Sequence, residues 1–518
     1  MGLVIEGRQP KPWVDSLFTF LRQVPGLDIQ LLPFEDQPAG VGQASGAAPW
    51  LVDRVYSAAR LRFDPFGPFG RGGEMAMNRE KSAADGAMDG IRNAGCEVLI
   101  WLAGEPDARL DLKDLTPKGA FTVRFGRLNR IIPFWDEVAN SEVTSVVTIA
   151  WHESSFWRGR VIRTPETSTA QGFYLTMNAE EPVEAAIRTL ASACVSLRSG
   201  LGIERLRNLP EEAMDALAKA GYPSTLEAGR FVVKKMAASA SVRLKSHGKE
   251  ARWLVAIRPN RGKSVNDPRG LDLTGFREVP LPPGTIEMAD PFLAEHDGHT
   301  YLLFEDIPAT RKGRLGCVEV FEDGSYSEMK IILERDYHLS YPCVVEENGE
   351  LFLLPETADA GKVELYRFTR FPWELDPTPR TLVEDLTVVD VTPIRHEGRW
   401  YFFATTKQPF LETLLFWADR LDGAWSLHPA SPISVSVRNS RSAGNLFWRN
   451  GRLYRPTQDC SVCYGYAMQV NEVTRLTPTE FTECFVQSVL PTWMPGLSGT
   501  HTWNESSQFQ VIDGIRFR

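Results

Sequence analysis

The fold is decided by the stretch Ala289-Asp290-Pro291-Phe292-Leu293, with the turn Asp297-Gly298 and the strand His299-Thr300-Tyr301-Leu302-Leu303-Phe304 after it. An acidic residue opens an apolar strand, a two-residue turn follows, and an aromatic-rich strand runs back. Similar units recur at intervals of about fifty residues towards the C-terminus. Repeats of this length, built from strands alone, predict the blades of a β-propeller.

Five such units predict five blades. Each unit carries a glycine after Asp, Asn or Glu, as a tight hairpin turn with positive φ at its central residues requires. The predicted turns are Asp297-Gly298, Asn348-Gly349, Glu397-Gly398, Asn450-Gly451 and Asp513-Gly514. The sequence ends soon after the last of these, so the final blade needs strands from elsewhere. Residues 252–257, an apolar run upstream of the first unit, are expected to complete that blade and close the ring.

The N-terminal third has a different pattern, in which strand-like and helix-like segments alternate. Strands are expected at 3–5, 28–33 and 97–102, and helices at 13–24 and 85–95. This alternation predicts an α/β domain with a parallel sheet. Residues 203–245 are rich in Ala, Leu, Glu and Lys and are expected to be helical. The expected domains are therefore 1–200, a helical connector at 201–250, and the propeller at 251–518.

The order of elements from residue 96 to residue 200 resembles the catalytic domain of formyltetrahydrofolate-dependent formyltransferases. The resemblance follows residues 97–100, 119–126, 143–149 and 158–162 and a helix at 182–197. It implies an Asn and a His two residues apart and a later Asp, but these places hold Thr122, Arg124 and Trp157. An indole cannot orient an imidazole as a carboxylate does, and a guanidinium is no general base near neutral pH. We therefore expect a degenerate formyltransferase-like domain that serves docking, small-ligand binding or dimerisation.

The motifs of the C-terminal half together resemble the N-terminal domain of plant glucosamine inositolphosphorylceramide transferases, and bacterial proteins that lack the transferase part. The motifs are Asp290-Pro291-Phe292, His338-Leu339-Ser340-Tyr341-Pro342, Pro355-Glu356, Asp390, residues 454–460 and Tyr464-Gly465. The resemblance implies a bacterial homologue with a five-bladed propeller similar to furanosidases. It does not imply the sugar transfer of the plant proteins, which the resemblance assigns to a separate domain.

A propeller brings the first strand of every blade to one axis, so polar residues far apart in the sequence meet in a central pocket. Glycosidic chemistry needs two carboxylates, one that protonates the leaving oxygen and one that acts as nucleophile or activates water. The candidate catalytic residues are Asp290 as base or nucleophile, Glu356 as general acid, and Asp390 as a second central carboxylate. The candidate substrate-binding residues are Glu305, His338, Tyr341, Arg441, Asn445, Asp459 and His501.

Composition excludes several other classes of function. The net charge of −9 and the lack of a basic stripe argue against a nucleic-acid partner, and no apolar run is long enough to cross a bilayer. Seven scattered cysteines and a start without a signal-peptide pattern favour a cytoplasmic protein. Cys460 and Cys463 form a C-x-x-C without a second ligand pair, so we expect structural thiols, no metal and no cofactor.

Two main hypotheses remain open at this point. The first is a carbohydrate-active enzyme, by glycosyl transfer or glycoside hydrolysis, of surface-glycan or glycolipid metabolism, with a carbohydrate or sugar-nucleotide ligand. The second is a non-catalytic module that binds a glycan or a nucleotide sugar. An amino-sugar formyltransferase is the least favoured alternative, because its Asn, His and Asp are missing. Two carboxylates facing one pocket would favour the enzyme.

Overall fold

The computed structural model describes residues 1–6, 12–23, 27–34, 82–102, 111–127, 133–153, 159–169, 178–200, 213–214, 251–260, 273–407 and 411–517, and short pieces between 224 and 234. The chain divides into two compact units, Met1–His247 and Gly248–Arg518. Most of the expected helical connector at 201–250 lies outside the described residues. No helix among the described residues is long and apolar enough to cross a membrane.

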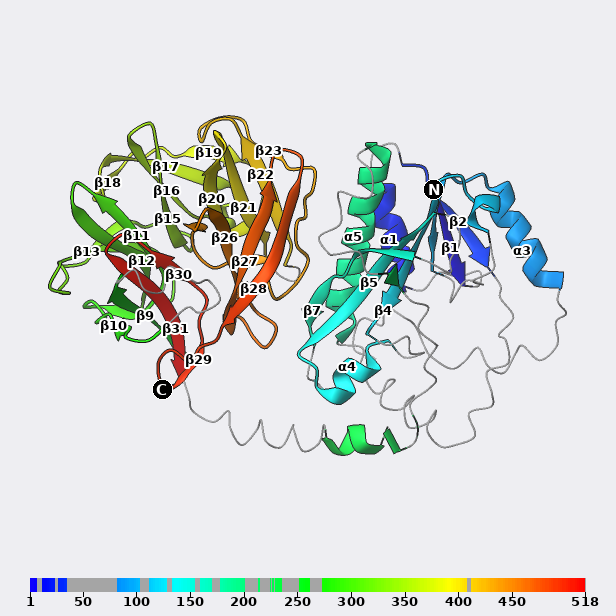
Figure 1. Cartoon of the computed structure of the whole chain (residues 1–518), viewed down its shortest axis with the longest axis horizontal. Coiled ribbons are helices and arrows are strands. Elements are labelled where there is room, and N and C mark those ends of the chain that lie inside the picture. The colour runs from blue at the N-terminus through cyan, green and yellow to red at the C-terminus, as the bar shows by residue number, and fades with distance from the viewer. Residues whose placement is uncertain are drawn as a thin grey trace. The chain divides into compact units, whose positions relative to one another are not determined.

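The N-terminal unit is an α/β sheet with helices (Figure 1). The described helices are α1 (Pro12–Arg22), α3 (Ser82–Asn93), α4 (Trp135–Asn140) and α5 (Glu180–Arg198). The strands are β1 (Gly2–Glu6), β2 (Gln30–Phe34), β3 (Val98–Trp101), β4 (Gly119–Phe125), β5 (Thr144–His152), β6 (Gly159–Arg163), β7 (Glu166–Ser168) and β8 (Ala213–Met214). Their order is β2-β1-β3-β4-β5-β6-β8, with β7 beside β5. The predicted early strands and helices are confirmed.

The expectation of a parallel sheet is only half right. Strands β2, β1, β3 and β4 are parallel, but β4 with β5, β5 with β6 and β7, and β6 with β8 are antiparallel. Parallel neighbours need a crossover of a dozen or more residues, and the short connection from β5 to β6 leaves no room for one. The unit is therefore a mixed sheet.

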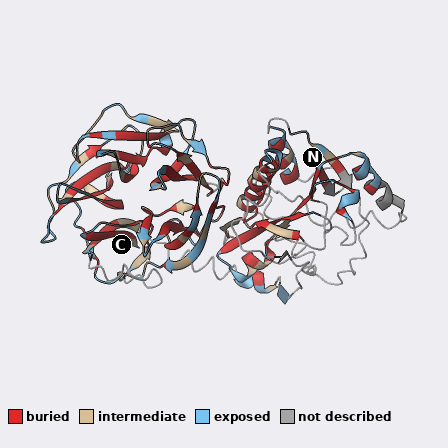
Figure 2. Ribbon diagram, turned by 45° about the horizontal axis from the view of Figure 1, so that its top comes forward, coloured by how far each residue is buried: buried red, intermediate tan, exposed pale blue. Residues whose placement is uncertain are grey.

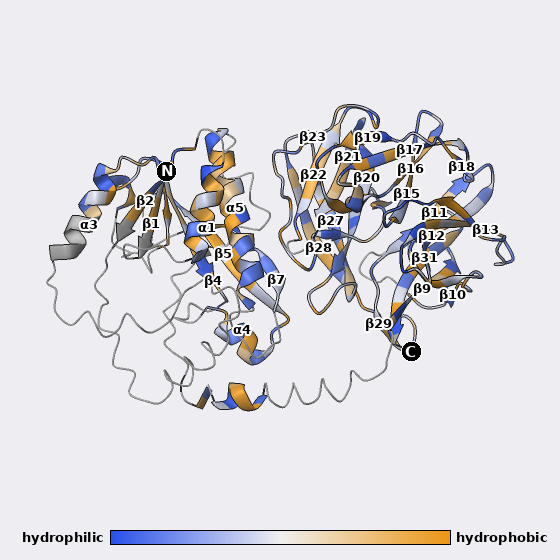
Figure 3. Cartoon of the chain, turned by 180° about the vertical axis from the view of Figure 1, so that it is seen from behind, coloured by the Kyte–Doolittle hydropathy of each residue, from blue (hydrophilic) through white to orange (hydrophobic). Residues whose placement is uncertain are grey.

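Apolar side chains pack on both faces of this sheet. Phe121, Ile149 and Leu17 belong to the cluster that contacts α1 and α5, whereas Ala120 and Ile91 belong to the cluster on the α3 side. Hydrophobic residues alternate with hydrophilic ones along α5, as Figure 3 shows, because only one face of the helix contacts the sheet. Successive side chains of β4 point to opposite faces of the sheet, so Ala120 and Phe121 belong to different clusters.

The C-terminal unit is a five-bladed β-propeller. Within residues 251–260, 273–407 and 411–517 the strands form five sheets. Blade 1 contains β11 (Thr285–His296), β12 (His299–Pro308), β13 (Arg314–Val320) and β14 (Lys330–Leu333). Blade 2 contains β15 (Ser340–Glu347), β16 (Glu350–Glu356), β17 (Val363–Arg370), β18 (Glu374–Leu375) and β19 (Arg380–Val383). Blade 3 contains β20 (Val388–His396), β21 (Arg399–Thr406), β22 (Thr413–Ala418) and β23 (Ser426–Leu427).

Blades 4 and 5 complete the set. Blade 4 contains β24 (Arg441–Ser442), β25 (Phe447–Arg449), β26 (Arg452–Asp459), β27 (Ala467–Leu476) and β28 (Phe481–Val489). Blade 5 contains β9 (Ala251–Pro259), β10 (Arg277–Glu278), β29 (Leu497–Gly499), β30 (Trp503–Glu505) and β31 (Phe509–Phe517). The strands surround a common centre, and their inner parts are largely buried (Figure 2).

The ring closes through blade 5, as the sequence predicts. Strand β31 pairs with β9 in an unbroken antiparallel register from Phe509 opposite Pro259 to Phe517 opposite Ala251. Buried clusters then join blade 5 to both neighbours: Val255 packs with Leu302 of blade 1, and Ala256 packs with Met468 of blade 4. The last strand of the described chain is therefore paired within a complete blade and is not left as an open edge.

Four of the five predicted turns are confirmed, and one prediction is wrong. Asp297, Asn348, Glu397 and Asn450 each have φ near +50° and are each followed by a glycine with φ near +80°. Asp513-Gly514, in contrast, lies inside β31, where Asp513 pairs with Val255. The dipeptide is in a strand because the β30–β31 connection falls earlier, at residues 506–508. A local Asp-Gly signal does not distinguish these two settings.

Candidate functional site

The same β-bulge occurs near the start of the first strand in three blades. In blade 1 the pairing shifts by one residue between Ala289 opposite Glu305 and Phe292 opposite Leu303. Blades 2 and 3 repeat this shift after Ser340 and after Val389. The bulged residues are Asp290, Tyr341 and Asp390, with φ of 49°, 49° and 51°. Positive φ is costly for residues other than glycine, and such backbone strain is concentrated at functional sites.

The register also gives two glutamates the same position in neighbouring blades. Glu305 stands opposite the residue before the bulge in blade 1, and Glu356 stands opposite the corresponding residue in blade 2. Both carboxylates are buried. Because bulges redirect side chains, the repeat brings the acidic groups of different blades to one place.

The acidic groups are close enough to change one another's pKa. Burial raises the pKa of Asp290 to about 7, and the carboxylates of Asp390, Glu305 and Asp513 add to the rise while His501 opposes it. Burial likewise raises the pKa of Glu356 to about 8, with a further rise from Asp390 and an opposing effect of Arg441. Asp290 and Glu356 also act on one another. At neutral pH Glu356 therefore holds its proton.

Arg441 is the central cation of the site. Its Nε donates to Oδ2 of Asp390 at 2.5 Å, and one Nη lies 4.0 Å from Oε2 of Glu356. The amide of Gln458 donates to the same Asp390 oxygen at 3.0 Å. The Tyr464 ring covers the guanidinium at 4.8 Å. Asp390 is thus held by Arg441 as its ion-pair partner, whereas Oε2 of Glu356 has no hydrogen-bond partner among the described residues.

A second cation, His501, lies on the other side of Asp290. Nδ1 of His501 is 2.5 Å from Oδ2 of Asp513, and its Nε2 is 3.9 Å from Oδ1 of Asp290. Burial alone would lower the pKa of His501, but the Asp513 carboxylate outweighs it and raises that pKa to about 9. The Thr502 hydroxyl donates to Asp290 at 2.7 Å, and the Trp253 ring stacks on the imidazole at 3.9 Å. Asp290 therefore faces a protonated imidazole.

The site is accessible at its rim. The Glu356 side chain is 10% exposed and that of Arg441 is 16% exposed. His338 is more open, and its Nε2 lies 3.1 Å from Oε1 of Glu305, whose hydrogen bond raises the pKa of His338. Tyr464 is 48% exposed.

Six of the ten candidate residues meet in this centre, and His338 lies at its rim. The six are Asp290, Glu305, Glu356, Asp390, Arg441 and His501. The other three have contacts of their own. The buried Tyr341 hydroxyl bonds to Thr392 and to the Gly444 amide, Asn445 accepts from Cys343, and Asp459 pairs with Arg438 at 3.1 Å.

Sequence reasoning missed other members of the centre: Trp253, Gln458, Tyr464, Thr502 and Asp513. Gln458 and Tyr464 stand in motifs that marked the blade, so their position was a usable signal. Asp513 was assigned to a turn, and Trp253 belongs to the upstream strand β9, which gives no local sign of lying at the centre.

Three residues of the centre also have a spacing that a metal ion could use. Asp290, His501 and Asp513 each offer an atom within 4.8 Å of the others, a spacing suitable for a metal, but His501 and Asp513 already form an ion pair with one another.

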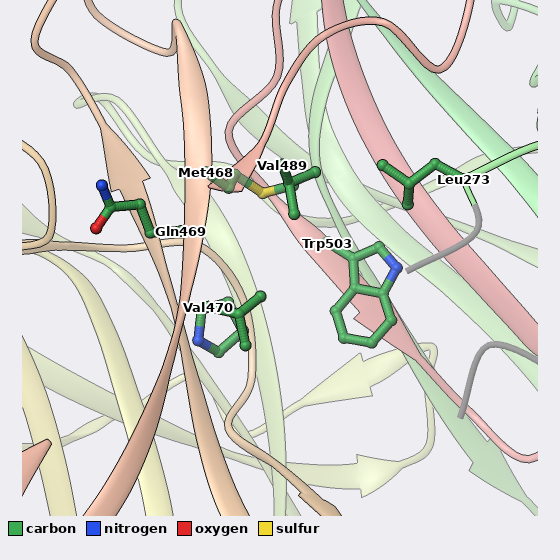
Figure 4. Close-up of a pocket in the computed structure, with 7 residues that line it drawn as sticks. Leu273, Met468, Gln469, Val470, Val489 and Trp503 are labelled. Atoms are coloured by element: carbon green, nitrogen blue, oxygen red, sulfur yellow. The ribbon is translucent and has the colours of Figure 1, made fainter. Parts of the chain in front are cut away.

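A small apolar pocket lies between blades 4 and 5 (Figure 4). It is lined by Leu273, Pro456, Met468, Gln469, Val470, Val489 and Trp503. Its lining has no ionisable side chain, so it is no centre for acid–base chemistry.

The propeller is similar in sequence to a domain of known proteins. Residues 283–513 match the family model described as glucosamine inositolphosphorylceramide transferase 1, N-terminal. The transferase of that name from rice (Oryza sativa subsp. japonica) is 31% identical over 228 residues, which is 42% of this chain and 30% of the rice protein. The Arabidopsis thaliana protein is 31% identical over 230 residues, 42% of this chain and 29% of the relative. Residues 283–513 of the propeller are thus similar in sequence to this N-terminal domain. The chain spans about 30% of the length of these curated relatives.

Solved structures match this chain with low TM-scores and low sequence identity. The GH43 protein BlXynB from Bacillus licheniformis matches with a TM-score of 0.34 and 13% identity, over 43% of this chain and 52% of that chain. An exo-1,5-α-L-arabinanase from a bovine ruminal metagenomic library matches with a TM-score of 0.31 and 12% identity, over 41% of this chain and 87% of that chain. The formyltransferase-like character of the N-terminal unit stays a prediction. Of the places where that resemblance expects catalytic residues, Trp157 lies outside the described residues.

Proposed function

We propose that the propeller is a carbohydrate-active enzyme that cleaves or transfers a glycosyl group at its central acidic site, in glycolipid or surface-glycan metabolism. The observation that carries this proposal is the contrast between two neighbouring carboxyl groups. Glu356 is protonated near neutral pH, with a pKa raised to about 8, whereas Asp390 is held by Arg441 as its charged partner. A proton donor beside a fixed anion is the equipment that cleavage of a glycosidic bond needs.

The proposed roles follow from the surroundings of each group. Glu356 donates its proton to the leaving oxygen, and its buried Oε2 makes no hydrogen bond to the described residues that would compete with this role. Asp290 acts as nucleophile or as the base that activates water, once His501 and Thr502 stabilise its charged form. Asp390 orients Arg441 and raises the pKa of Glu356. Tyr464, exposed above Arg441, offers its ring to a sugar face.

Homology supports the carbohydrate assignment but leaves the reaction open between transfer and hydrolysis. The matched relatives have the name glucosamine inositolphosphorylceramide transferase 1, and the match covers about 30% of their length. A non-catalytic module that binds a glycan or nucleotide sugar is therefore the alternative proposal. A cytoplasmic location likewise stays a proposal, based on the odd number of scattered cysteines.

The test is an activity screen of the intact chain with sugar nucleotides and with chromogenic glycosides, furanosides included. We expect Glu356→Gln to reduce turnover about 10²–10⁴-fold on glycosides with a poor leaving group, and far less on activated aryl glycosides, which need no protonation. Asp290→Asn should reduce turnover on both kinds. Glu347→Gln is the matched control, since Glu347 is a buried carboxylate that accepts from Trp400 and Leu421 outside the site.

The alternative, a non-catalytic binding module, predicts a different result. If no donor or glycoside turns over with the wild type, and Glu356→Gln and Asp290→Asn bind the same glycans as the wild type on an array, the catalytic proposal is wrong. Turnover that Glu347→Gln diminishes as strongly as Glu356→Gln would also contradict the assigned role of Glu356.

A further inference from the structure

We infer that the N-terminal unit contains a binding site for a small molecule that presents an oxyanion, a carboxylate or a phosphate group, centred on Arg124. This site is independent of the propeller centre. Thr122 and Arg124 on β4 and Thr148 and His152 on β5 form its walls. In the β4–β5 register, Ala120 stands opposite His152 and Arg124 stands opposite Thr148. Since alternate residues of a strand face the same way, all four side chains share one face of the sheet.

The position of these residues in the sheet is one at which α/β proteins bind ligands. Strands β1, β3 and β4 are parallel, and Arg124 is the last residue but one of β4. In α/β sheets ligands bind outside the carboxyl ends of parallel strands. At β4 the sheet also changes from parallel to antiparallel pairing, because β5 runs the other way. The polar residues thus lie where the topology changes.

The polar groups are held in place before any ligand arrives. The Thr122 hydroxyl and Nε2 of His152 are 2.9 Å apart, and Nη2 of Arg124 donates to the Thr148 hydroxyl at 3.3 Å. Gly159 on β6 fixes the imidazole, since a Cβ there would lie 2.3 Å from a ring carbon of His152. A donor set fixed by its neighbours binds without losing much side-chain freedom.

The charge of Arg124 is not compensated. Among the described parts of the chain, no carboxylate forms an ion pair with this guanidinium, and its Nε is buried without a hydrogen-bond acceptor. Burial lowers the pKa of Arg124. Arg127, on the same strand's C-terminal side, does have such a neighbour, Glu166 at 3.8 Å.

A partly buried cation without a counter-charge lowers the stability of the fold. A ligand oxyanion would remove that cost, because the planar guanidinium offers paired donors that match carboxylate and phosphate oxygens. The hydroxyls of Thr122 and Thr148 supply further donors to the same group. The ligand class follows from this chemistry: a small molecule with at least one carboxylate or phosphate.

The test uses thermal unfolding of the intact chain in the presence of inorganic phosphate, with chloride added to keep the ionic strength constant. We expect phosphate to raise the unfolding midpoint of the N-terminal unit by about 3 °C at ten times its dissociation constant. Arg124→Met should lose this shift and, without phosphate, should unfold at the same or a higher temperature than the wild type. Arg188→Met, which removes an arginine of α5 that pairs with Glu184, is the control and should keep the shift.

A second measurement does not depend on the stability of the variant. In spectra of the ¹⁵N-arginine-labelled wild type, the Nε–H resonance that Arg124→Met removes should move as phosphate is added. Acetate in a parallel titration distinguishes the carboxylate from the phosphate form of the ligand. An Arg124 resonance that neither anion moves, or an equal phosphate shift in wild type and Arg124→Met, would overturn the inference.

Discussion

Nδ1 of His501 lies 2.5 Å from Oδ2 of Asp513, and both side chains are almost fully buried beside Asp290. The second oxygen of Asp513 accepts from the backbone amides of His501 and Thr502, both at 2.9 Å. Asp513 thereby fixes both the charge and the orientation of the imidazole. Nε2 of the same ring lies 3.9 Å from Oδ1 of Asp290, so this pair also determines the charge that Asp290 faces.

Removal of the Asp513 charge should therefore change the ionisation of His501. In Asp513→Asn we expect the pKa of His501 to fall from about 9, because burial is then unopposed by the carboxylate. At Asp290 two changes oppose one another, since a less strongly charged His501 raises its pKa and the loss of the Asp513 charge lowers it. NMR titration of the His501 ring measures the first effect. Asp459→Asn is the control, since Asp459 pairs with Arg438, and it should leave the His501 titration unchanged.

Stability should fall as the pH rises from about 5 to about 9. In the folded protein the pKa values of Asp290, Glu356 and His501 are raised to about 7, 8 and 9, above those of the unfolded chain. The folded state therefore holds protons that the unfolded state has released, and their stabilising effect disappears as the pH passes the folded pKa values. Urea unfolding at several pH values measures this slope.

The same series with Glu356→Gln identifies the contribution of one group. An amide cannot titrate, so the decrease in unfolding free energy between about pH 5 and 8 should become shallower. Glu347→Gln, outside the site, should retain the wild-type slope. A slope that is the same in all three proteins would mean that Glu356 has an ordinary pKa.

Arg441 should be essential for the stability of the propeller as well as for its proposed activity. Arg441→Met leaves the Asp390 carboxylate, which is 1% exposed, without its cation. Breaking a buried ion pair in this way costs about 3–5 kcal/mol. In the double variant with Asp390→Asn much of this loss should be recovered, because no buried charge is left unpaired. A double-mutant cycle in urea measures the coupling, and additive effects would show that the two residues do not act as a pair.

Gly465 permits the stacking of Trp253 on His501. A Cβ at Gly465 would lie 2.6 Å from the Trp253 ring, and φ at this residue is +66°. Gly451 has a similar φ of +75° but no atom within 4 Å of its virtual Cβ. Both Gly→Ala variants should lose about 1 kcal/mol from backbone strain. Only Gly465→Ala should also change the near-ultraviolet circular dichroism of tryptophan and reduce turnover. Identical spectra for the two variants would contradict this role of Gly465.

Much of the propeller could be predicted because its signals are local. A tight hairpin demands positive φ at two residues, and Asn-Gly and Asp-Gly meet that demand at Asn348, Asn450 and Asp297. The partner of the last strand could be predicted from the need to close the ring. The error at Asp513 has the same origin as the successes, since an Asp-Gly pair inside a buried strand resembles one in a turn.

The site could be predicted only where a residue opens a blade. Asp290 and Asp390 were found in this way, and the register explains Glu305 and Glu356 afterwards. Whether a polar group reaches the centre or is used within a blade depends on packing between blades, which the sequence does not reveal. Tyr341 occupies the same bulge position as Asp290, but its hydroxyl bonds to Thr392 and Gly444. The mixed sheet was missed because the direction of β5 depends on a connection, not on its composition.

The pairing of β31 with β9 has a consequence for biosynthesis. The ribosome releases β9 first among the propeller strands, and it must wait for its neighbour until residues 509–517 have been made. His501 and Asp513 come from the same late segment of the propeller, so the acidic centre is assembled only after the other blades have been made. A nascent chain that stalls before this segment would carry four blades with an open edge and no imidazole beside Asp290. Chaperones that shield exposed strands would therefore matter most while residues 509–517 are still missing from the propeller.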